Sequence, residues 1–364
     1  QYCILRRQQV DYSRHAAPYY LGENDSHFFQ TFHRNKRSVT LDIKSAEGRA
    51  AFERLVATAD AVTNNLRGDQ PEKLRLTHAH LGTIKPSIVC GHLSGFGRTG
   101  ERSSWPAYDY LIQAEAGFMD VTGDPGGPPE RMGLSIVDYM TGMTLALAVT
   151  AGLLGAARTG RGRDVDVTLY DVAIHQLSYP ATWYLNEGHE THRRPRSGHP
   201  HVVPCELFPT RDGHIFLMCV LPKFWEALCR VVGRPDLVAD DRFRTHADRF
   251  RNRDALAAIL DEALSARTTA EWMAMMAGTV PAAPVLTIAA ALDNPVLADR
   301  GGIASYPHPA RPEGLRMLSN PIRVDGRVLP GAVCSPLGAD TEALLAEVGY
   351  GADDVARLRA AGIA

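Results

Sequence analysis

The chain has 364 residues, of which 45% are hydrophobic and 22% are charged, and its formal net charge is −2. This composition is typical of a globular protein and excludes extensive disorder, and the small net charge gives no indication of a nucleic-acid or anionic-membrane partner. The length favours two lobes of roughly 100–200 residues each.

The first half of the chain is predicted to alternate helices and strands. Apolar residues recur at helical spacing over Ser45–Asp60, with Ser45 as a plausible N-cap. Strands are expected at 61–63, 87–93 and 164–169, and helices at 141–157, where a weakly polar run indicates a buried helix, and from 171 onward. This alternation favours an α/β fold with a mostly parallel sheet.

The second half has a different character. A polar stretch rich in His, Arg and Pro over 187–204 is typical of a loop, and Thr210–Gly213 is predicted to be a hairpin turn. Helices are expected at 224–232, 253–266, 270–277 and 341–358. We therefore predict a large lobe over 1–190, a small inserted α+β lobe over 191–292, and a return to the large lobe over 293–364.

The six cysteines are scattered, and no pair has the Cys-x-x-Cys spacing of a zinc or redox site. Single thiols in a chain of this length suit a reducing compartment. No apolar run approaches the roughly 20 residues that span a bilayer, and the opening residues do not resemble a signal peptide. We therefore expect a cytoplasmic protein without a membrane partner.

Two patterns resemble known site motifs and are discounted. Gly95–Gly100 fits G-x-G-x-x-G, but the proline-containing segment after it lacks the helix that dinucleotide binding requires. A tight turn is the preferred interpretation. A histidine group in a polar loop lacks the spacing of metal ligands, so we predict no metal site there; its members are His189, His192, His199, His201 and His214.

Asp138 is the single acid in an otherwise apolar run at the start of the predicted helix. An acid in apolar surroundings is costly unless it caps a helix or has a function. Two interpretations follow from the residues alone. Asp138 is either the N-cap of a helix that begins at Met140 or a reacting group.

Motifs in a fixed order, from about Arg34 to the C-terminus, resemble those of the family III coenzyme A transferases. That family includes formyl-CoA transferase, carnitine CoA-transferase and α-methylacyl-CoA racemase. The matching segments are 35–44, 65–67, 94–100, 106–110, 122–129, 133–142, 159–167, 197–200, 210–213 and 336–338.

The resemblance assigns a role to individual residues. It implies that Asp138 is the catalytic carboxylate and that Tyr108 lies beside the thioester, with Gly95 and Gly97 in a loop near the substrate. The positions that correspond to coenzyme A contacts are Leu41, Lys44, Asn65, Leu66, Arg67 and Lys73. Further basic candidates for the phosphates are Arg34, Lys36 and Arg37, for which a solvated basic face is the alternative.

The implied activity is transfer of coenzyme A from an acyl-CoA donor to a carboxylic acid acceptor, with coenzyme A as a substrate and without a permanently bound cofactor. The implied fold has a Rossmann-like large lobe and forms an interlocked homodimer. Two alternatives stay open: an isomerase of the racemase type and a catalytically silent acyl-CoA binder.

The sequence departs from the family pattern at three places. The racemase branch has a His where this chain has Tyr108, which favours transfer over racemisation. The oxalate-specific branch has a run of glycines near Ser197–Pro200, which this chain lacks, and this favours the succinyl-CoA-using branches. The family also opens with a strand–turn–helix segment of about 30 residues, and this sequence begins near the second strand.

Overall fold

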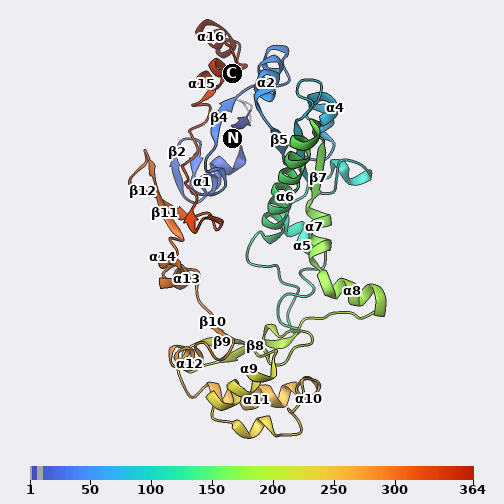
Figure 1. The fold of residues 1–364 in the computed structure, drawn as a ribbon, viewed down its shortest axis with the longest axis vertical. Coiled ribbons are helices and arrows are strands. Elements are labelled where there is room, and N and C mark those ends of the chain that lie inside the picture. The colour runs from blue at the N-terminus through green and yellow to red at the C-terminus, as the bar shows by residue number, and fades with distance from the viewer. Residues whose placement is uncertain (1, 6–10) are drawn as a thin grey trace. The chain divides into compact units, whose positions relative to one another are not determined.

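The computed structural model describes residues 2–5 and 11–364 (Figure 1). They divide into two compact units, the first containing the described residues up to 106 with 142–168 and 292–364, and the second containing 107–141 and 169–291. This division differs from the lobes expected from the sequence. Residues 107–141 and 169–190 group with the second unit and not with the large lobe.

Parallel strands form the framework of the first unit. Strands β5 (Ala61–Asn64), β6 (Val89–Ser94) and β7 (Asp164–Thr168) make one parallel sheet in that order. Strands β1 (Tyr2–Leu5) and β4 (Arg37–Thr40) pair in parallel in a second sheet. With the helices that join these strands, this arrangement confirms the expected α/β class.

Helix α2 (Ala46–Thr58) connects β4 to β5 and begins as the sequence predicts. The Ser45 hydroxyl accepts the Gly48 N–H at 3.0 Å, which satisfies one of the free amides of the first turn. Ala51 and Leu55 pack toward β4 and the C-terminal helices, whereas Phe52 packs toward β6. The helix therefore joins the two cores of the first unit.

Helix α6 (Ile136–Thr159) packs against the β5–β6–β7 sheet through two glycines. A Cβ at Gly91 would lie 2.8 Å from Val149, and one at Gly152 would lie 2.9 Å from Val89, so the helix approaches the sheet closely because side chains are absent there. The expectation that this helix is buried is wrong. Met143 and Leu147 on its outer face are 65% and 71% exposed.

The length and apolar composition of α6 also meet the usual test for a membrane-spanning helix, contrary to the sequence-based expectation. A single helix of this kind is weak evidence, because core helices of soluble proteins meet the same test. Contact with the β5–β6–β7 sheet explains why one face of α6 is apolar.

The second unit contains an antiparallel sheet in the order β10 (Ala282–Pro284), β9 (His214–Met218), β8 (Cys205–Pro209). The predicted hairpin turn is confirmed, since the Thr210 N–H bonds to the Gly213 carbonyl at 2.9 Å. Phe208, Trp225 and Leu260 belong to the core between this sheet and its helices. Those helices are α9 (Pro222–Val231), α10 (His246–Arg251), α11 (Arg253–Leu264) and α12 (Thr269–Met276).

The C-terminal segment contributes to the first unit through a hairpin and two helices. The hairpin pairs β11 (Ile303–His308) with β12 (Arg311–Leu318). The single helix expected over 341–358 is instead two, α15 (Thr341–Glu347) and α16 (Ala352–Ala360). They separate at Gly349, whose φ of +87° lies in the left-handed region that glycine adopts readily.

Short elements complete both units. In the first they are β2 (Tyr20–Gly22), β3 (Asp25–Ser26), α1 (His27–His33), α3 (Gln70–Lys73), α4 (His78–Leu81), α14 (Pro295–Asp299), β13 (Arg323–Val324) and β14 (Arg327–Val328). In the second they are α5 (Asp109–Glu115), α7 (Leu169–Gln176) and α8 (Ser178–Glu187), and α13 (Ile288–Leu292) ends at the boundary.

Candidate active site

Asp138 lies in the first turn of α6, which begins at Ile136. It is therefore inside the helix, and the alternative that it caps a helix starting at Met140 is wrong. Its side chain reaches solvent, and no residue in the described part of the chain forms a hydrogen bond with its carboxylate. The carboxylate is thus available to an incoming molecule.

A second carboxylate, that of Asp109, forms a hydrogen bond with the Asp138 backbone. Asp109, the first residue of α5, is only 4% exposed, and its Oδ2 accepts the Asp138 backbone N–H at 2.9 Å. Its Oδ1 accepts a hydrogen bond from Gln113 Nε2 at 2.6 Å. Asp109 therefore satisfies an amide that the first turn of α6 leaves without a helical partner.

Gln113 extends this support to the segment that leads into α6. Its Nε2 also donates to the Leu134 carbonyl at 3.2 Å, and its Oε1 accepts the Met132 N–H at 2.9 Å. Neither Asp109 nor Gln113 is among the site residues predicted from the sequence. The sequence does contain a signal for this pair, because an acid and an amide four residues apart in an apolar stretch lie on the same face of a helix.

The surroundings of Asp138 raise its pKa above the usual range. Neighbouring protein atoms partly shield the carboxylate from water, and the Asp109 charge adds electrostatic repulsion. Both effects destabilise the ionised form. The carboxylate is consequently more basic than a fully solvated aspartate, which favours attack on an electrophilic carbonyl.

Tyr108 directly precedes α5 in the same unit as Asp138, and it is 72% exposed. Its carbonyl accepts the Ile112 N–H at 3.2 Å and so starts the helix. The phenol is accessible to a ligand.

Three of the predicted coenzyme residues and the two predicted substrate glycines lie at one edge of the β5–β6–β7 sheet. Asn65–Arg67 follow β5, and Gly95–Gly97 follow its parallel neighbour β6. The two turns touch, because a Cβ at Gly68 would lie 1.8 Å from the Gly97 carbonyl oxygen. Ligands of open parallel sheets commonly bind at this edge, at the carboxyl ends of the strands.

The charged side chains near these turns are partly neutralised. Asp69 accepts a 2.7 Å bond from Lys73 Nζ and lies 3.4 Å from Arg67 Nε. The Lys73 ammonium holds the pKa of the Asp69 carboxyl below its usual range. A phosphate bound here would compete with Asp69 for both cations.

The remaining predicted coenzyme residues differ in accessibility. Lys44 is exposed just before α2, whereas the Leu41 side chain is 1% exposed in the core, so only the backbone of Leu41 is available to a ligand. Among the further basic candidates, Arg34 and Lys36 bond to the carbonyls of Leu318 and Phe32, and Arg37 pairs with Glu347 at 2.9 Å.

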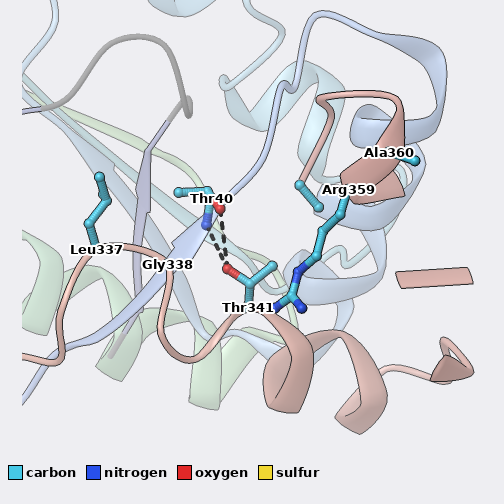
Figure 2. Close-up of a pocket in the computed structure, with 7 residues that line it drawn as sticks. Thr40, Leu337, Gly338, Thr341, Arg359 and Ala360 are labelled. Carbon is cyan, nitrogen blue, oxygen red and sulfur yellow. Dashed lines mark hydrogen bonds between the residues drawn. The ribbon is translucent and has the colours of Figure 1, made fainter. Parts of the chain in front are cut away.

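A cavity of about 480 Å³ lies beside the end of β4 (Figure 2). None of the predicted site residues lines it. Thr40 and Thr341 face each other across one side, with the Thr40 N–H donating to Thr341 Oγ1 at 3.1 Å. The other lining residues are Leu337, Gly338, Arg359, Ala360 and Ala364.

The histidine-rich loop has its own local bonding. His199 Nδ1 accepts the backbone N–H groups of His201 and Val202, and its Nε2 lies 3.0 Å from the Tyr179 hydroxyl. Among residues 11–364, no group of three His, Cys, Asp or Glu side chains is arranged to hold a metal ion.

Comparison with known proteins identifies the family. Residues 4–341 match the family described as CoA-transferase family III. The chain belongs to this family. It is therefore a CoA-transferase, as the motifs around Asp138 and the β5 and β6 turns indicated.

Two relatives named as CoA-transferases are similar over most of their length. An acetyl-CoA:oxalate CoA-transferase from Acetobacter aceti is 33% identical, with 87% of this chain and 79% of that protein covered. A succinyl-CoA:mesaconate CoA-transferase from Haloarcula marismortui is 32% identical, with 88% of this chain and 82% of that protein covered.

A solved structure has the same fold. The crystal structure of a CAIB/BAIF family protein from Brucella suis has a TM-score of 0.81 and 30% sequence identity, and the match covers 95% of this chain and 91% of that one.

We expect Asp138→Asn to stabilise this CoA-transferase at neutral pH. The pKa of Asp138 is higher in the folded protein than in the unfolded chain. Ionisation of Asp138 therefore lowers the free energy of unfolding at pH values above the folded-state pKa, and this loss disappears below the unfolded-state pKa. Urea unfolding from pH 7 to pH 3 should show an advantage of the variant that shrinks as the pH falls. Exposed Asp120→Asn is the control for loss of one charge, and an equal gain there would contradict the prediction.

Gly68→Ala should weaken coenzyme A binding, because the new methyl group forces the β5 and β6 turns apart. Gly126→Ala, where a Cβ meets no atom within 4 Å, is the matched control. Calorimetric titration with coenzyme A should show a loss for Gly68→Ala alone. Equal affinities for the two variants would mean that the contact between the turns does not shape the coenzyme site.

Proposed function

We propose that the chain moves coenzyme A between carboxylic acids through covalent intermediates on Asp138. The observation that carries this proposal is the Asp138 carboxylate itself, which is accessible, makes no hydrogen bond within residues 11–364, and is held at the start of α6 by Asp109. A general base is unnecessary, because a carboxylate is already ionised above its pKa.

The proposed reaction conserves the acyl activation at each step. Asp138 attacks the thioester carbonyl, the C–S bond breaks, and a mixed anhydride and coenzyme A thiolate result. The thiolate then attacks the aspartyl carbonyl, which releases the donor acid as its carboxylate and leaves an aspartyl-CoA thioester. The acceptor carboxylate runs the two steps in reverse, so neither ATP nor a metal is consumed.

Coenzyme A binding is proposed for the turns that follow β5 and β6, with Asn65, Leu66 and Arg67 contacting the nucleotide and Lys44 and Lys73 near the phosphates. Gly95 and Gly97 are proposed to approach the substrate. The Gly97 N–H already donates to Ser94 Oγ at 3.0 Å, so it serves the turn and not an oxyanion.

The acids exchanged are proposed to be small dicarboxylates. Relatives that cover most of this chain are named for oxalate, mesaconate and glutarate, each of which carries two carboxyl groups. The oxalate-named relative is as similar as the mesaconate-named one, so the His–Pro loop at 197–200 does not by itself exclude oxalate.

A homodimer and a cytoplasmic location are proposed as well. The apolar outer face of α6, with Met143, Leu147 and Leu154 between 55% and 71% exposed, is a surface that a second copy would bury. Cys90, Cys205, Cys219 and Cys229 are free thiols, as suits a reducing compartment.

Incubation with a panel of acyl-CoAs, followed by hydroxylamine or borohydride quenching and mass spectrometry, should label Asp138. The label should be absent from Asp138→Asn and present in Asp120→Asn. An unlabelled wild type that still binds coenzyme A would overturn the covalent mechanism. Deuterium wash-in at the α-carbon without an acceptor acid would then support the isomerase alternative, in which Tyr108 replaces a histidine, and its absence would support a silent binder.

Leu147→Glu should convert the dimer into a monomer, because a carboxylate placed in an apolar interface is left without a partner. Light scattering coupled to gel filtration measures this directly. Val324→Glu, at another exposed apolar residue in β13, should leave the dimer intact. A monomeric wild type, or a dimeric Leu147→Glu, would contradict the assignment of this face.

A further inference from the structure

A chain of hydrogen bonds crosses the β5–β6–β7 sheet and ends at the Asn65–Arg67 turn, where coenzyme A is proposed to bind. Its centre is His92 of β6, which is 1% exposed. His92 Nε2 lies 2.9 Å from Asp164 Oδ1 on β7, and His92 Nδ1 lies 2.9 Å from Asn64 Nδ2 at the end of β5. Asn64 Oδ1 then accepts the Leu66 N–H at 3.4 Å.

The partners determine the direction of every bond in this chain. The Asn64 oxygen faces the Leu66 N–H, so its amide nitrogen faces His92 and donates. His92 Nδ1 must therefore be the acceptor, and the ring proton is assigned to Nε2, from which it is donated to Asp164. A side chain at position 92 without an acceptor here would leave the Asn64 amide free to rotate.

Asp164 is itself fixed. It accepts the His78 N–H at 2.8 Å, and its other oxygen lies 3.5 Å from the Arg98 guanidinium, which also pairs with Asp166. The chain thus begins at a carboxylate with a counter-charge and ends at the backbone of Leu66. No link in it uses a side chain already assigned to coenzyme contact.

The turn is held at both ends, because the Arg67 carbonyl accepts the Gln70 N–H at 2.9 Å and Gly68 touches Gly97, and the Asn64 amide restrains its middle. The Leu66 side chain packs against the core of Leu76 and Ile88, whereas Asn65 and Arg67 on either side are exposed. The Leu66 N–H is the point at which the Asn64 amide fixes the backbone of Asn65–Arg67.

We propose that His92 is a positioning residue for coenzyme A: through Asn64 it holds the Asn65–Arg67 turn in the conformation that binds the nucleotide. This inference rests on the proposed coenzyme site. His92 touches no reacting atom, so its loss should affect the affinity for coenzyme A and not the chemistry at Asp138.

The test compares His92→Leu, Asn64→Ala and the double variant with Cys90→Ala. Cys90 lies two residues away on the same strand and is also fully buried, so it controls for damage to the core. The first two variants should each weaken coenzyme A binding about five- to tenfold, as expected for one hydrogen bond. The double variant should lose no more than either single one, because both break the same chain.

Two further readouts separate positioning from general damage. Hydrogen exchange of peptides that contain Leu66 should accelerate in His92→Leu and Asn64→Ala but not in Cys90→Ala at a similar melting temperature. The rate of Asp138 labelling at saturating acyl-CoA should stay at the wild-type value.

Wild-type affinity and exchange in His92→Leu would overturn the inference, as would additive losses in the double variant. If the wild type binds no coenzyme A, the proposed function is wrong. Hydrogen exchange tests the inference independently of that result, because unchanged exchange at Leu66 in His92→Leu would show that the hydrogen-bond chain does not restrain the turn.

Discussion

The hydrogen bond from the Asp138 backbone to the buried Asp109 carboxylate is the constraint on which the candidate site depends. It places one negative group beneath another at the start of α6. The helix terminus gains an acceptor for a free amide, but partial burial, and after it the Asp109 charge, destabilise the ionised Asp138 carboxylate and raise its pKa. An acid whose ionised form is destabilised is the pattern expected of a reacting group, which supports the role proposed for Asp138.

Local patterns were sufficient for elements whose cause is local. Ser45 was predicted as an N-cap from its place before an apolar helical run, and its hydroxyl indeed accepts the Gly48 N–H. Thr210–Gly213 was predicted as a turn from its composition, and its closing bond is present. In both instances the neighbours in sequence are also the neighbours in space.

The remaining features depend on contacts between distant residues. Asp109 supports Asp138 across 29 positions of the chain, and sequence periodicity carries no information about that pairing. The exposed face of α6 is not predicted, because the sequence pattern of an apolar helix is the same whether a sheet, a second chain or solvent lies beside it. The break at Gly349 was missed because one glycine is tolerated within many helical patterns.

The proposed function divides binding from chemistry. Arg67 and Lys73 share Asp69, so a phosphate at the proposed coenzyme site would gain these cations only by displacing a carboxylate, and charge alone would supply little net affinity there. The shape of the site would then contribute more, which requires a turn that does not rearrange when the ligand binds. The Asn64 amide and the contact of Gly68 with Gly97 provide that rigidity from within the sheet. The role proposed for Asp138 has a different requirement, since a residue that forms and breaks bonds needs a free carboxylate, and Asp138 is fixed through its backbone while its carboxylate stays open.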